Sequence, residues 1–589
     1  MSQTFYTNVQ VYGNNILYRG VENGKRISNK IQYQPTLFLA SSHPTEYTTV
    51  TGIHVIPKKF ENMRECRTFT NSMKDIENLT IYGNQRFEYS YIFENFRSDI
   101  NWERSLINVC NIDIEVGSEN GFPEPSTASE PITAITYKMN NKFVVYGCGE
   151  FKNTRTDVKY IKCFDELDLI KRFVDDWTGN YPDIITGWNV KFFDIPYLVN
   201  RIKKLLGEDF AKRLSPWNIL YTREIFIMGR EQTAYIPLGI AILDYMELYK
   251  KFVPGGASQE SYKLDAICHN DLNERKLSYE EYGSLHTLYR DNYQKFIEYN
   301  IRDVELVEKL DGKHKVIDLV LTLSYDNKCN YEDVFTQVRM WDVIIYNYLR
   351  DRNIVIPLKE DNTKSEAFEG AYVKDPLVGQ HKWVASFDLN SLYPHLIMQY
   401  NMSPETLSDT RLDLNVEKLL NNEPIDIAKI AGLSVTANGW CYKKDTKGFL
   451  PALMEEMYNN RSKFKKQMLK AEQEYEKTKD PLLVKEISKL KNLQMAMKIA
   501  LNSAYGAVGN RYFRYYDLRI AEGITTSGQL SIRWMANKLN DFMNKTMKTK
   551  GEDYVIAIDT DSIYLTLEKL DRKSTRLNSS HRCISYAVF

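Results

Sequence analysis

The chain has 589 residues, and at about 150 residues per domain it is expected to form roughly four domains. Apolar residues make up 43% and charged residues 26% of the composition, which excludes a disordered, collagen-like or low-complexity protein. Basic and acidic residues are equal in number, 77 each, so net charge indicates no class of partner.

Neither a membrane span nor a leader is predicted. No apolar run reaches the roughly 18 residues that cross a bilayer, and the first residues, MSQTFYTNVQ, lack the basic and apolar segments of a signal peptide. The eight cysteines form no Cys-x-x-Cys pair, which argues against a disulfide framework and a structural zinc. The sequence therefore predicts a protein that is neither secreted nor membrane-bound and that acts in the cytoplasm.

The first half of the chain divides into two patterns. Residues 1–107 alternate apolar and polar residues between Asn and Gly turns, which predicts a mixed-β N-terminal domain. Residues 108–314 alternate strand-like and helical runs, which indicates an α/β domain. The strand-like runs are INVCNIDIEVG, DIITGWNV and GIAILDYMELY, and the helical runs are DLIKRFVDDW, PYLVNRIKKLLG and YQKFIEYNIRDVELVEKL.

Further along, residues 315–360 are expected to be helical and then loop-like, and a strand, KWVASFDLNSLY, begins near residue 382. Residues 450–510 are predicted to form helices on both sides of a break at Asp480-Pro481, and another strand, DYVIAIDTDSIYLTL, ends near residue 567. Thirteen basic and five acidic residues lie between 461 and 514. This excess fits a solvated helical hairpin or a contact with polyphosphate or nucleic acid.

The α/β segment carries four acids and a tyrosine that could serve one site. Asp113 and Glu115 lie two apart on a predicted strand and share a face, where two carboxylates are costly unless a cation such as Mg²⁺ or Mn²⁺ joins them. Asp194 precedes a predicted helix, and Tyr299 and Asp303 lie one helical turn apart. Each residue alone also fits a structural role, as a helix cap, a surface acid or a strand end.

A second acidic group lies near the end of the chain. SFDLNSLYP places Asp388 at the end of an apolar strand, and AIDTDSIYL places Asp559 and Asp561 two apart on one face of a strand. Three carboxylates from two strands could form a two-metal site for a triphosphate. Taken alone, the DTD segment also fits a surface hairpin.

Basic and polar side chains between these two strands form helical faces. Lys498, Asn502 and Tyr505 follow the spacing of one face, and Arg461 and Lys465 form an i, i+4 pair on the preceding helix. A cationic face opposite three acids suits a metal-bound triphosphate. KIALNSAYG also fits an ordinary amphipathic helix.

The order of these motifs resembles that of known enzymes. D-x-E, N-x₃-FD and Y-x₃-D resemble the three exonuclease motifs of DnaQ-like proofreading nucleases, which have an RNase H-like fold. DLNSLYP, KIALNSAYGAVGN and IDTDS resemble motifs A, B and C of family B DNA polymerases. The segments LDYMELYKKF, FEGAYVKDP, SFDLNSLYPHLI and RYFRYYDLRIAEGITTSGQ are similar to the replicative polymerases of large tailed phages, and the resemblance covers residues 1–570.

The resemblance implies roles for the candidate residues. In the exonuclease site, Asp113, Glu115, Asp194 and Asp303 would hold two metals, and Tyr299 would orient the attacking water.

In the polymerase site, Asp388 and Asp561 would be the main metal ligands, with the Leu389 carbonyl as a further ligand and Asp559 in support. The implied nucleotide contacts are Ser391, Leu392 and Tyr393 around the triphosphate, Arg461, Lys465 and Lys498 on its phosphates, and Asn502 and Tyr505 at the nascent base pair. Tyr393 would also exclude a 2′-hydroxyl.

The implied function is template-directed DNA synthesis with 3′→5′ proofreading in phage DNA replication. It would use two Mg²⁺ per active site, with Mn²⁺ as a substitute, and act on primer–template DNA, single-stranded 3′ ends and dNTPs. By analogy with the family, the partners would be a sliding clamp, a single-strand-binding protein and a helicase-primase in the cytoplasm of a bacterial host. The alternatives for this chain are a 3′→5′ exonuclease only, or a non-catalytic nucleic-acid-binding fragment.

The resemblance also implies a domain order. The N-terminal domain would comprise residues 1–107 and 315–360, the exonuclease 108–314, the palm 361–447 and 511–570, and the fingers 448–510. Together these form a multidomain protein of α/β and α+β type.

Three departures from the family pattern stand out. Ile558 occupies the position before DTD where phage members usually have Gly, so it is expected to crowd the primer end. The segment from Arg461 to Lys498 is short, as in the compact fingers of most family B members. Residues 571–589 begin with DRKSTRLNSSH, which reads like a translated adapter oligonucleotide, so this tail is expected to be non-native and the thumb to be absent.

Overall fold

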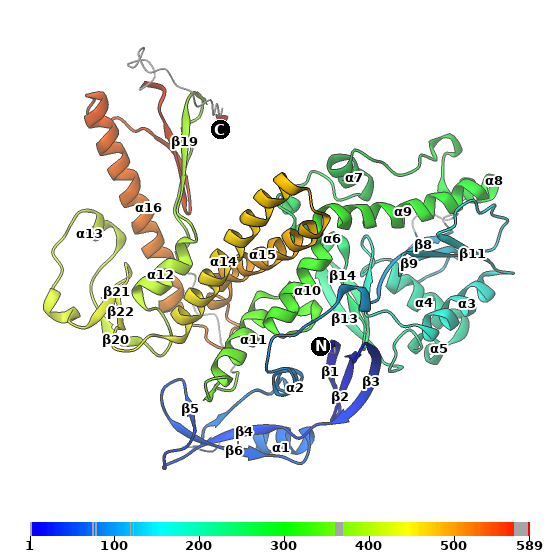
Figure 1. Cartoon of the computed structure of the whole chain (residues 1–589), viewed down its shortest axis with the longest axis horizontal. Coiled ribbons are helices and arrows are strands. Elements are labelled where there is room, and N and C mark those ends of the chain that lie inside the picture. Colours follow the sequence, from blue (N-terminus) through cyan, green and yellow to red (C-terminus); the bar gives the residue numbers. More distant parts are fainter. Residues whose placement is uncertain are drawn as a thin grey trace. The chain divides into compact units, whose positions relative to one another are not determined.

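A computed structural model of the chain describes residues 3–73, 76, 79–117, 119, 121, 123–227, 229–359, 369–569 and 587–588 (Figure 1). The chain forms two compact units. Residues 1–37, 57–79 and 84–336 make up the first unit, and residues 38–56, 80–83 and 337–589 make up the second. The expected second part of the N-terminal domain, residues 315–360, is thus divided between the two units.

The first unit opens with an antiparallel sheet of three strands, as the alternating pattern predicts. The strands are β1 (Thr4–Tyr12), β2 (Asn15–Glu22) and β3 (Lys25–Gln32). Helices α1 (Met63–Met73) and α2 (Phe87–Asn95) and the 3₁₀ turn η1 (Arg104–Leu106) follow. Arg19 on β2 donates hydrogen bonds to the carbonyl oxygens of Pro182 (2.8 Å) and Gly239 (2.6 Å), which joins this sheet to the α/β part of the unit.

The centre of the first unit is a mixed six-stranded sheet with the order β11-β10-β9-β8-β12-β15. Its strands are β8 (Val109–Val116), β9 (Ile132–Met139), β10 (Lys142–Gly147), β11 (Val158–Lys162), β12 (Ile184–Thr186) and β15 (Ala241–Ile242). β8 runs parallel to β12 and antiparallel to β9. The predicted α/β domain is confirmed.

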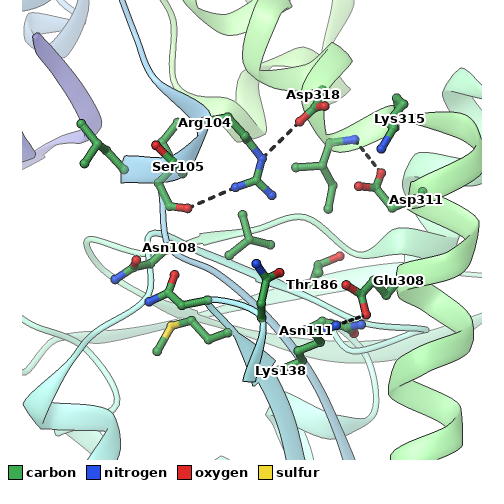
Figure 2. Close-up of a pocket in the computed structure, with 18 of the residues that line it drawn as sticks. Arg104, Ser105, Asn108, Asn111, Lys138, Thr186, Glu308, Asp311, Lys315 and Asp318 are labelled. Atoms are coloured by element: carbon green, nitrogen blue, oxygen red, sulfur yellow. Dashed lines mark hydrogen bonds and ion pairs between the residues drawn. The ribbon is translucent and has the colours of Figure 1, made fainter. Parts of the chain in front are cut away.

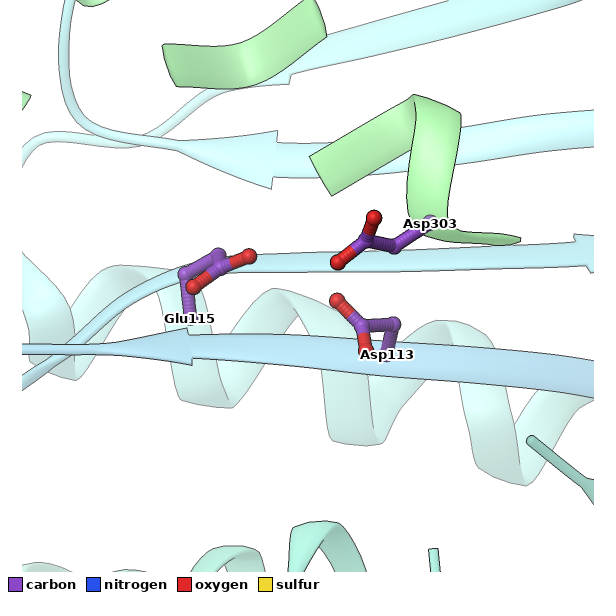
Figure 3. Close-up of side chains that lie close together, drawn as sticks. All are labelled: Asp113, Glu115 and Asp303. Carbon is purple, nitrogen blue, oxygen red and sulfur yellow. The ribbon is translucent and has the colours of Figure 1, made fainter. Parts of the chain in front are cut away.

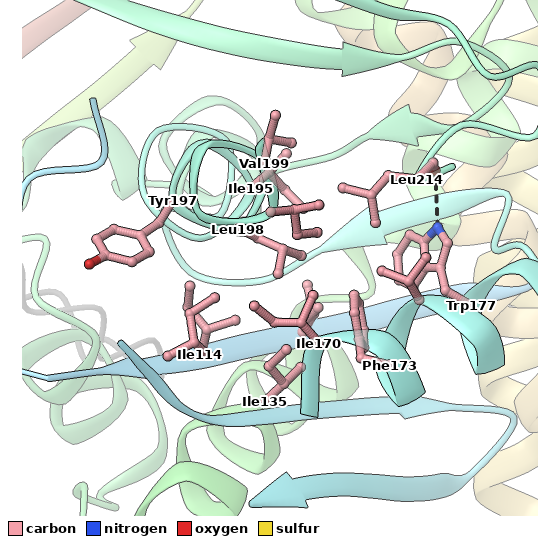
Figure 4. Close-up of a cluster of buried hydrophobic side chains, with 14 of the residues drawn as sticks. Ile114, Ile135, Ile170, Phe173, Trp177, Ile195, Tyr197, Leu198, Val199 and Leu214 are labelled. Atoms are coloured by element: carbon pink, nitrogen blue, oxygen red, sulfur yellow. Dashed lines mark hydrogen bonds between the residues drawn. The ribbon is translucent and has the colours of Figure 1, made fainter. Parts of the chain in front are cut away.

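Side-chain alternation along β8 separates a hydrophobic core from a polar face. Ile112 and Ile114 pack with the apolar sides of α3 (Glu166–Gly179), α4 (Asp194–Leu206) and α5 (Glu208–Lys212), as Figure 4 shows for α3 and α4. The Trp177 indole N–H in this core donates to the Leu214 carbonyl oxygen (3.0 Å). Because successive side chains point to opposite faces, Asp113 and Glu115 face away from this core, toward α9 (Tyr293–His314).

The first unit also contains a β-hairpin and several further helices. The hairpin strands are β13 (Leu220–Ile227) and β14 (Arg230–Pro237). The remaining elements are α6 (Tyr245–Phe252), η2 (Gly256–Ser258), α7 (Leu264–Leu272), η3 (Glu280–Tyr282), α8 (Leu285–Asp291), α10 (Val316–Asn327) and η4 (Tyr331–Phe335).

The prediction of one strand over GIAILDYMELY is wrong, because only Ala241–Ile242 is a strand and a helix begins at Tyr245. Asp244 caps that helix by accepting hydrogen bonds from the backbone N–H groups of Met246 (2.9 Å) and Glu247 (3.3 Å). The Asp244 cap therefore starts a helix where the apolar run alone predicts a strand.

Two small sheets lie mainly in the second unit. One has the order β16-β5-β6-β4-β7, with β4 (Thr36–Ala40), β5 (Tyr47–Thr49), β6 (His54–Lys59), β7 (Ile81–Tyr82) and β16 (Ile354–Val355). The other comprises β20 (Leu407–Arg411), β21 (Leu433–Val435) and β22 (Trp440–Lys443), near α13 (Val416–Leu420) and η5 (Ile427–Ile430).

A four-stranded antiparallel sheet with the order β17-β23-β24-β19 forms the centre of the second unit. Its strands are β17 (Val373–Lys374), β19 (Val384–Asp388), β23 (Val555–Asp559) and β24 (Ser562–Thr566), and β19 leads into α12 (Leu392–Tyr400). The long helix α16 (Leu518–Met547) packs against this sheet through Ile532, Ala536 and Met543.

The segment DYVIAIDTDSIYLTL was predicted as a single strand, and this is wrong, because it folds as the β23–β24 hairpin with Ile558 paired to Ile563. Thr560 at the turn has a φ of 54°, a left-handed conformation that a continuous strand cannot contain.

Two long antiparallel helices, α14 (Phe449–Thr478) and α15 (Pro481–Val508), lie side by side in the second unit (Figure 1). The predicted break is confirmed: Asp480 caps α15 by accepting a hydrogen bond from the Leu482 N–H (2.9 Å), and Pro481 occupies the first turn. Helix α11 (Gln337–Arg350) packs on α15, and its Trp341 indole N–H donates to the hydroxyl of Ser503 (3.0 Å).

The tail beyond residue 570 lies outside the described residues except for β25 (Ala587–Val588), which pairs with β18 (Gln380–His381). The expectation that residues 571–589 are non-native therefore lies almost entirely outside the described residues. Among the described helices, none combines the length and the apolar character that a bilayer crossing requires.

Candidate active sites

Three carboxylates converge between β8 and α9 in the first unit. Asp113 and Glu115 come from β8 and Asp303 from α9, and one oxygen of each lies within 4.8 Å of the others (Figure 3). Within the described part of the chain, no other group of three or more His, Cys, Asp or Glu side chains meets this criterion. The predicted sharing of a strand face by Asp113 and Glu115 is thus confirmed.

Asp194, the fourth predicted acid, lies beside this triad and not within it. It is the first residue of α4, and its Oδ1 accepts a hydrogen bond from the backbone N–H of Ile114 (3.0 Å), between the two acids of β8. Burial raises the pKa of Asp194 to about 7, and the backbone hydrogen bond from Ile114 opposes that rise. Asp194 therefore couples α4 to the strand that carries the acids.

The acids are held in a buried setting that penalises their charge. Burial raises the pKa of Glu115 to about 8, and the carboxylate of Asp303 adds to the rise. The pKa of Asp113 is raised well above its ordinary value by burial and then by the charge of Asp194. Such a cluster favours a cation.

Lys276 supplies one positive charge, and the sequence analysis missed it. Its ammonium forms an ion pair with Asp303 Oδ2 (2.5 Å) and donates to the hydroxyl of Tyr299 (3.0 Å). Burial opposes the charge on Lys276, but Asp303, Tyr299 and Asp113 together raise its pKa well above the ordinary value. Lys276 lies outside the helices and strands, so neither periodicity nor motif spacing singled it out.

Asn300 is the second residue that the sequence analysis missed. Its side-chain N–H donates to Asp113 Oδ2 (2.6 Å), which fixes the orientation of that carboxylate. Asn300 lies next to Tyr299 on α9 and three residues before Asp303. Because residues three apart on a helix are neighbours, the helical spacing could have predicted that Asn300 lies beside Asp303.

The triad fits a divalent metal ion. Asp303 is 4% exposed, and its Oδ1 has no hydrogen-bond partner among the described residues, so this oxygen is free for a ligand. Three carboxylates within this distance match the hard oxygen donors that Mg²⁺ and Mn²⁺ prefer.

The loop that leads to Asp194 is anchored by Asp244. Besides capping α6, the buried Asp244 carboxylate accepts a hydrogen bond from the Lys191 backbone N–H (3.0 Å). The Lys191 ammonium in turn contacts Glu247 on α6 (2.9 Å). One carboxylate thus ties the loop before α4 to the start of α6.

In the second unit, the sheet brings Asp388 next to the β23–β24 turn. Asp388 is paired in register with Ser562, whose hydroxyl donates to Asp388 Oδ2 (3.3 Å), and the Leu389 N–H donates to the Asp561 carbonyl oxygen (2.9 Å). Burial and the neighbouring charge of Asp388 raise the pKa of Asp561.

The prediction that Asp559 and Asp561 share one face of a strand is wrong. Asp559 ends β23, while Asp561 lies in the turn and its backbone N–H donates to the Asp559 carbonyl oxygen (2.6 Å). Asp388 and Asp559 are exposed, and these three acids do not meet the distance criterion of the buried triad. The alternative interpretation of this segment as a hairpin is confirmed, and the acidic site stays a prediction.

Ile558 is buried on β23, next to the turn. Its side chain is 3% exposed and belongs to the core formed with α16 and Ile563. The side chain thus packs in the core, and the expected crowding of a primer end stays a prediction.

The turn after Asp388 holds the predicted nucleotide contacts. Ser391 precedes α12 with a φ of 54°, and its hydroxyl accepts a hydrogen bond from Arg461 Nη1 of α14 (3.2 Å). The Tyr393 ring lies against the Tyr505 ring of α15 with centroids 4.9 Å apart. A Cβ on Gly528 would lie 2.8 Å from the Tyr393 ring, so α16 approaches this ring closely only because residue 528 is Gly.

The remaining predicted residues of this site are less constrained. Lys465, Lys498 and Asn502 are exposed on α14 and α15, and within the described part of the chain none of the three makes a hydrogen bond or an ion pair. Leu392 is buried and Leu389 packs at the margin of the sheet core. The structure therefore brings Arg461 into contact with Ser391, and Tyr505 into contact with Tyr393. It leaves Lys465, Lys498 and Asn502 exposed to solvent.

An α/β domain with a buried carboxylate cluster, combined with an acidic hairpin sheet and a long helical pair, is the architecture of a polymerase that also carries an editing nuclease. The model of DNA polymerase family B matches residues 335–581, and the model of the family B exonuclease domain matches residues 60–267. The first match extends past residue 570 into residues outside the described part.

Individual relatives agree with these matches. The chain is 34% identical to the DNA-directed DNA polymerase of Escherichia phage RB69, over 96% of this chain and 70% of the relative. It is 33% identical to that of Enterobacteria phage T4, over 97% of this chain and 70% of the relative. The DNA polymerase delta catalytic subunit of Schizosaccharomyces pombe is 26% identical, over 78% of this chain and 42% of the relative.

The chain therefore belongs to DNA polymerase family B. It is a phage-type DNA-directed DNA polymerase with an exonuclease domain.

Proposed function

We propose that the triad of Asp113, Glu115 and Asp303, with Asp194, is the 3′→5′ editing site of this polymerase. The observation that carries the proposal is the convergence of three carboxylates within 4.8 Å on the polar face of the exonuclease sheet, two of them buried and that of Asp113 half-buried. The four acids would hold two Mg²⁺ ions, with Mn²⁺ as a substitute. When bound, these ions supply charge neutralisation at the scissile phosphate and activation of water.

The protein groups around the acids position the reacting parts. Tyr299 directs its hydroxyl toward the site and is held by the Lys276 ammonium, so it is placed to orient a water molecule. Asn300 holds Asp113 by a hydrogen bond, and the Oδ1 atom of Asp303 has no hydrogen-bond partner among the described residues. The substrate would be a single-stranded 3′ end, because an unpaired end separates from its template at lower cost than a paired one.

For synthesis, we propose that Asp388 and Asp561, with the Leu389 carbonyl, hold the metal-bound dNTP, and that Asp559 supports them. Arg461 is held by Ser391 at the start of α12, so it is placed to contact a phosphate of a nucleotide bound over that turn. Leu392, Lys465, Lys498 and Asn502 would complete the contacts with the nucleotide and the base pair. Tyr393, supported by Tyr505, would lie under the sugar and exclude a 2′-hydroxyl.

The test of the editing site is the double substitution Asp113→Ala with Glu115→Ala. We expect it to abolish shortening of labelled single-stranded DNA in Mg²⁺, because two of the three clustered ligands are removed. The matched control is Glu208→Ala with Asp209→Ala, an acid pair on α5 whose side chains are 55% and 96% exposed. Continued shortening by the Asp113/Glu115 variant would refute the assignment.

The same gel separates the two activities. A labelled primer–template incubated with Mg²⁺ and dNTPs should be extended, and without dNTPs it should be shortened. The second candidate, an exonuclease without synthesis, is favoured by one observation: the triad is assembled and none of its members is fully exposed, whereas Asp388 and Asp559 are exposed. Shortening without any extension would support that candidate.

By analogy with the family, the protein would act in phage DNA replication in the cytoplasm of a bacterial host. A sliding clamp, a single-strand-binding protein and a helicase-primase would be its partners.

A further inference from the structure

Two cysteines follow paired strands at one edge of the six-stranded sheet of the first unit. Cys148 comes directly after β10 and Cys163 directly after β11, and both are free thiols. They lie at the end of β10 opposite to the pocket of Figure 2, which Asn140 and Asn141 line at the β9–β10 turn. Neither cysteine lines that pocket, and neither belongs to the acidic triad.

The strand register places the two cysteines opposite each other. β10 and β11 run parallel, and their last pair is Gly147 with Lys162, so the next pair is Cys148 with Cys163. The Cys163 backbone N–H donates to the Gly147 carbonyl oxygen (2.8 Å), which continues the ladder by one residue past the strand ends. Neighbouring strands lie about 4.7–4.9 Å apart, within the range of about 4.4–6.8 Å between the Cα atoms that a disulfide joins.

Both side chains also lie on the same face of the sheet. Tyr146 and Ile161, two residues earlier on each strand, pack with the core that α3, α4 and α5 cover, and side-chain alternation returns Cys148 and Cys163 to this core. Burial raises the pKa of the Cys163 thiol to about 12, and the neighbouring Cys148 thiol adds to the rise. Register, face and electrostatics therefore agree that the two thiols are neighbours.

The two thiols differ in their access to solvent. Cys148 is half-buried, whereas Cys163 is 2% exposed. The Cys163 thiol donates a hydrogen bond to the Ile161 carbonyl oxygen (3.5 Å), and because S–H donors are weak, rotation of this thiol toward Cys148 costs little. A reagent from solvent therefore meets Cys148 first, and Cys163 is placed to react second.

We propose that Cys148 and Cys163 form a reversible disulfide when the protein meets a disulfide of low molecular mass. The Cys148 thiolate attacks one sulfur of the oxidant, which forms a mixed disulfide and releases one thiolate of the oxidant. The Cys163 thiolate then attacks the Cys148 sulfur and displaces the other. Two cysteine thiols are oxidised, the oxidant is reduced to two thiols, and the protons of the cysteines pass to them. The proposal is independent of the roles given to the acids.

The cross-link would fasten the edge of the sheet to the start of α3. Cys163 lies two residues before Asp165, which caps that helix. The new bond closes the loop from residue 148 to residue 163, and closing a loop of about 15 residues restricts the unfolded chain. We therefore expect oxidation to raise the melting temperature by about 5 °C, and reduction to reverse the rise.

The test is oxidation of the reduced full chain with oxidised glutathione. Free thiols are then blocked with N-ethylmaleimide in denaturant, and the chain is digested with trypsin without reductant. Cys148 lies in the tryptic peptide of residues 143–152 and Cys163 in that of residues 163–171. We expect a product with the summed mass of these two peptides less two hydrogens, which dithiothreitol removes.

Two variants separate the roles of the thiols. Cys163→Ala should trap one glutathione on Cys148, because no second thiol displaces it. Cys148→Ala should leave Cys163 unmodified, because that side chain is buried. The matched control is Cys110→Ala, a buried cysteine of the same core on β8, which should form the linked peptide and show the rise in melting temperature as the unaltered chain does.

The unaltered chain decides the proposal if a variant does not fold, which thermal melting of the reduced variants verifies. The proposal is overturned if both cysteines of the folded, unaltered chain are recovered as blocked thiols after oxidation. It is also overturned if either cysteine is found linked to a different cysteine, or if the linked peptide forms only in denaturant.

Discussion

Asp303 contacts two kinds of partner, the carboxylates of β8 and the ammonium of Lys276. The ammonium engages Oδ2, and Oδ1 is left without a hydrogen-bond partner among the described residues. A single carboxylate therefore has one oxygen held by an ion pair and one without a hydrogen-bond partner among the described residues. The two oxygens differ in this way because Lys276, which is distant from the motifs in sequence, contacts one of them.

The raised pKa of Glu115 predicts a dependence of stability on pH. Its pKa rises from 4.5 to about 8 on folding, so between these values the folded state retains a proton that the unfolded state has released. In EDTA, stability should therefore fall as pH rises from 5 to 8. Glu115→Gln should flatten this fall, measured as the melting temperature against pH.

Divalent ions should reverse the trend, because they bind the ionised carboxylates. Mg²⁺ should raise the melting temperature of the unaltered chain more at pH 8 than at pH 6. An equal increase at both pH values, or none in either, would contradict the assignment of these acids as ligands.

Tyr393 allows a test of sugar selection. Its ring is held between Tyr505 and the backbone at Gly528, so Tyr393→Ala should open space beside a bound sugar. We expect ribonucleotide incorporation to rise by about a hundredfold relative to deoxynucleotide, since removal of a steric barrier lowers discrimination by a few kcal/mol. Tyr393→Phe, which keeps the ring, is the control in single-nucleotide extension assays, and unchanged selectivity in Tyr393→Ala would exclude the role.

At the scale of elements, the loop between β12 and α4 shows how local interactions place Asp194, the fourth acid of the proposed editing site. The Asp244 carboxylate joins the Lys191 N–H to the N-terminus of α6, and Asp194 then joins α4 to β8. Asp244→Ala should lower stability by about 1–3 kcal/mol and reduce exonuclease activity by about tenfold or more, with primer extension retained.

The matched control for Asp244 is Asp165→Ala. Asp165 caps α3 through the Asp168 N–H (2.8 Å), so its loss removes a helix cap in the same domain. We expect a similar loss of stability and unchanged exonuclease activity, measured on single-stranded DNA. Equal losses of activity in both variants would show that Asp244 acts through stability alone.

The sequence predicted elements well where one periodicity dominated, and failed where a local interaction competed with it. The helices around Asp480-Pro481 were predicted correctly, because a capping Asp and an N-terminal Pro agree with the helical pattern. DYVIAIDTDSIYLTL shows no Gly or Pro at its turn, so alternation alone suggested one strand where Thr560 reverses the chain.

The candidate sites show the same difference between residues that the sequence predicts and residues that it does not. Strand spacing predicted that Asp113 and Glu115 share a face, and the resemblance to the exonuclease motifs joined Asp303 to them, as the cluster confirms. Lys276 could not, because its contribution arises from tertiary packing.

At the scale of the whole molecule, the two proposed sites lie in different compact units, each with its own hydrophobic core. The triad rests on the cores formed by α3, α4 and α9 with the first unit's sheet, and the β23–β24 hairpin rests on the core with α16. Damage at one site should leave the other site folded.

Asp561→Ala is the sharpest test of this independence. The substitution removes a proposed metal ligand at a half-buried turn, so synthesis should fall by about a hundredfold or more. Because it removes no side chain from either hydrophobic core, shortening of single-stranded DNA should continue. Asp541→Ala, at a 74% exposed side chain on α16, is the control and should retain both activities. Loss of both activities in Asp561→Ala would mean that the two units do not fold independently, because a single substitution in the turn would then have unfolded the nuclease as well.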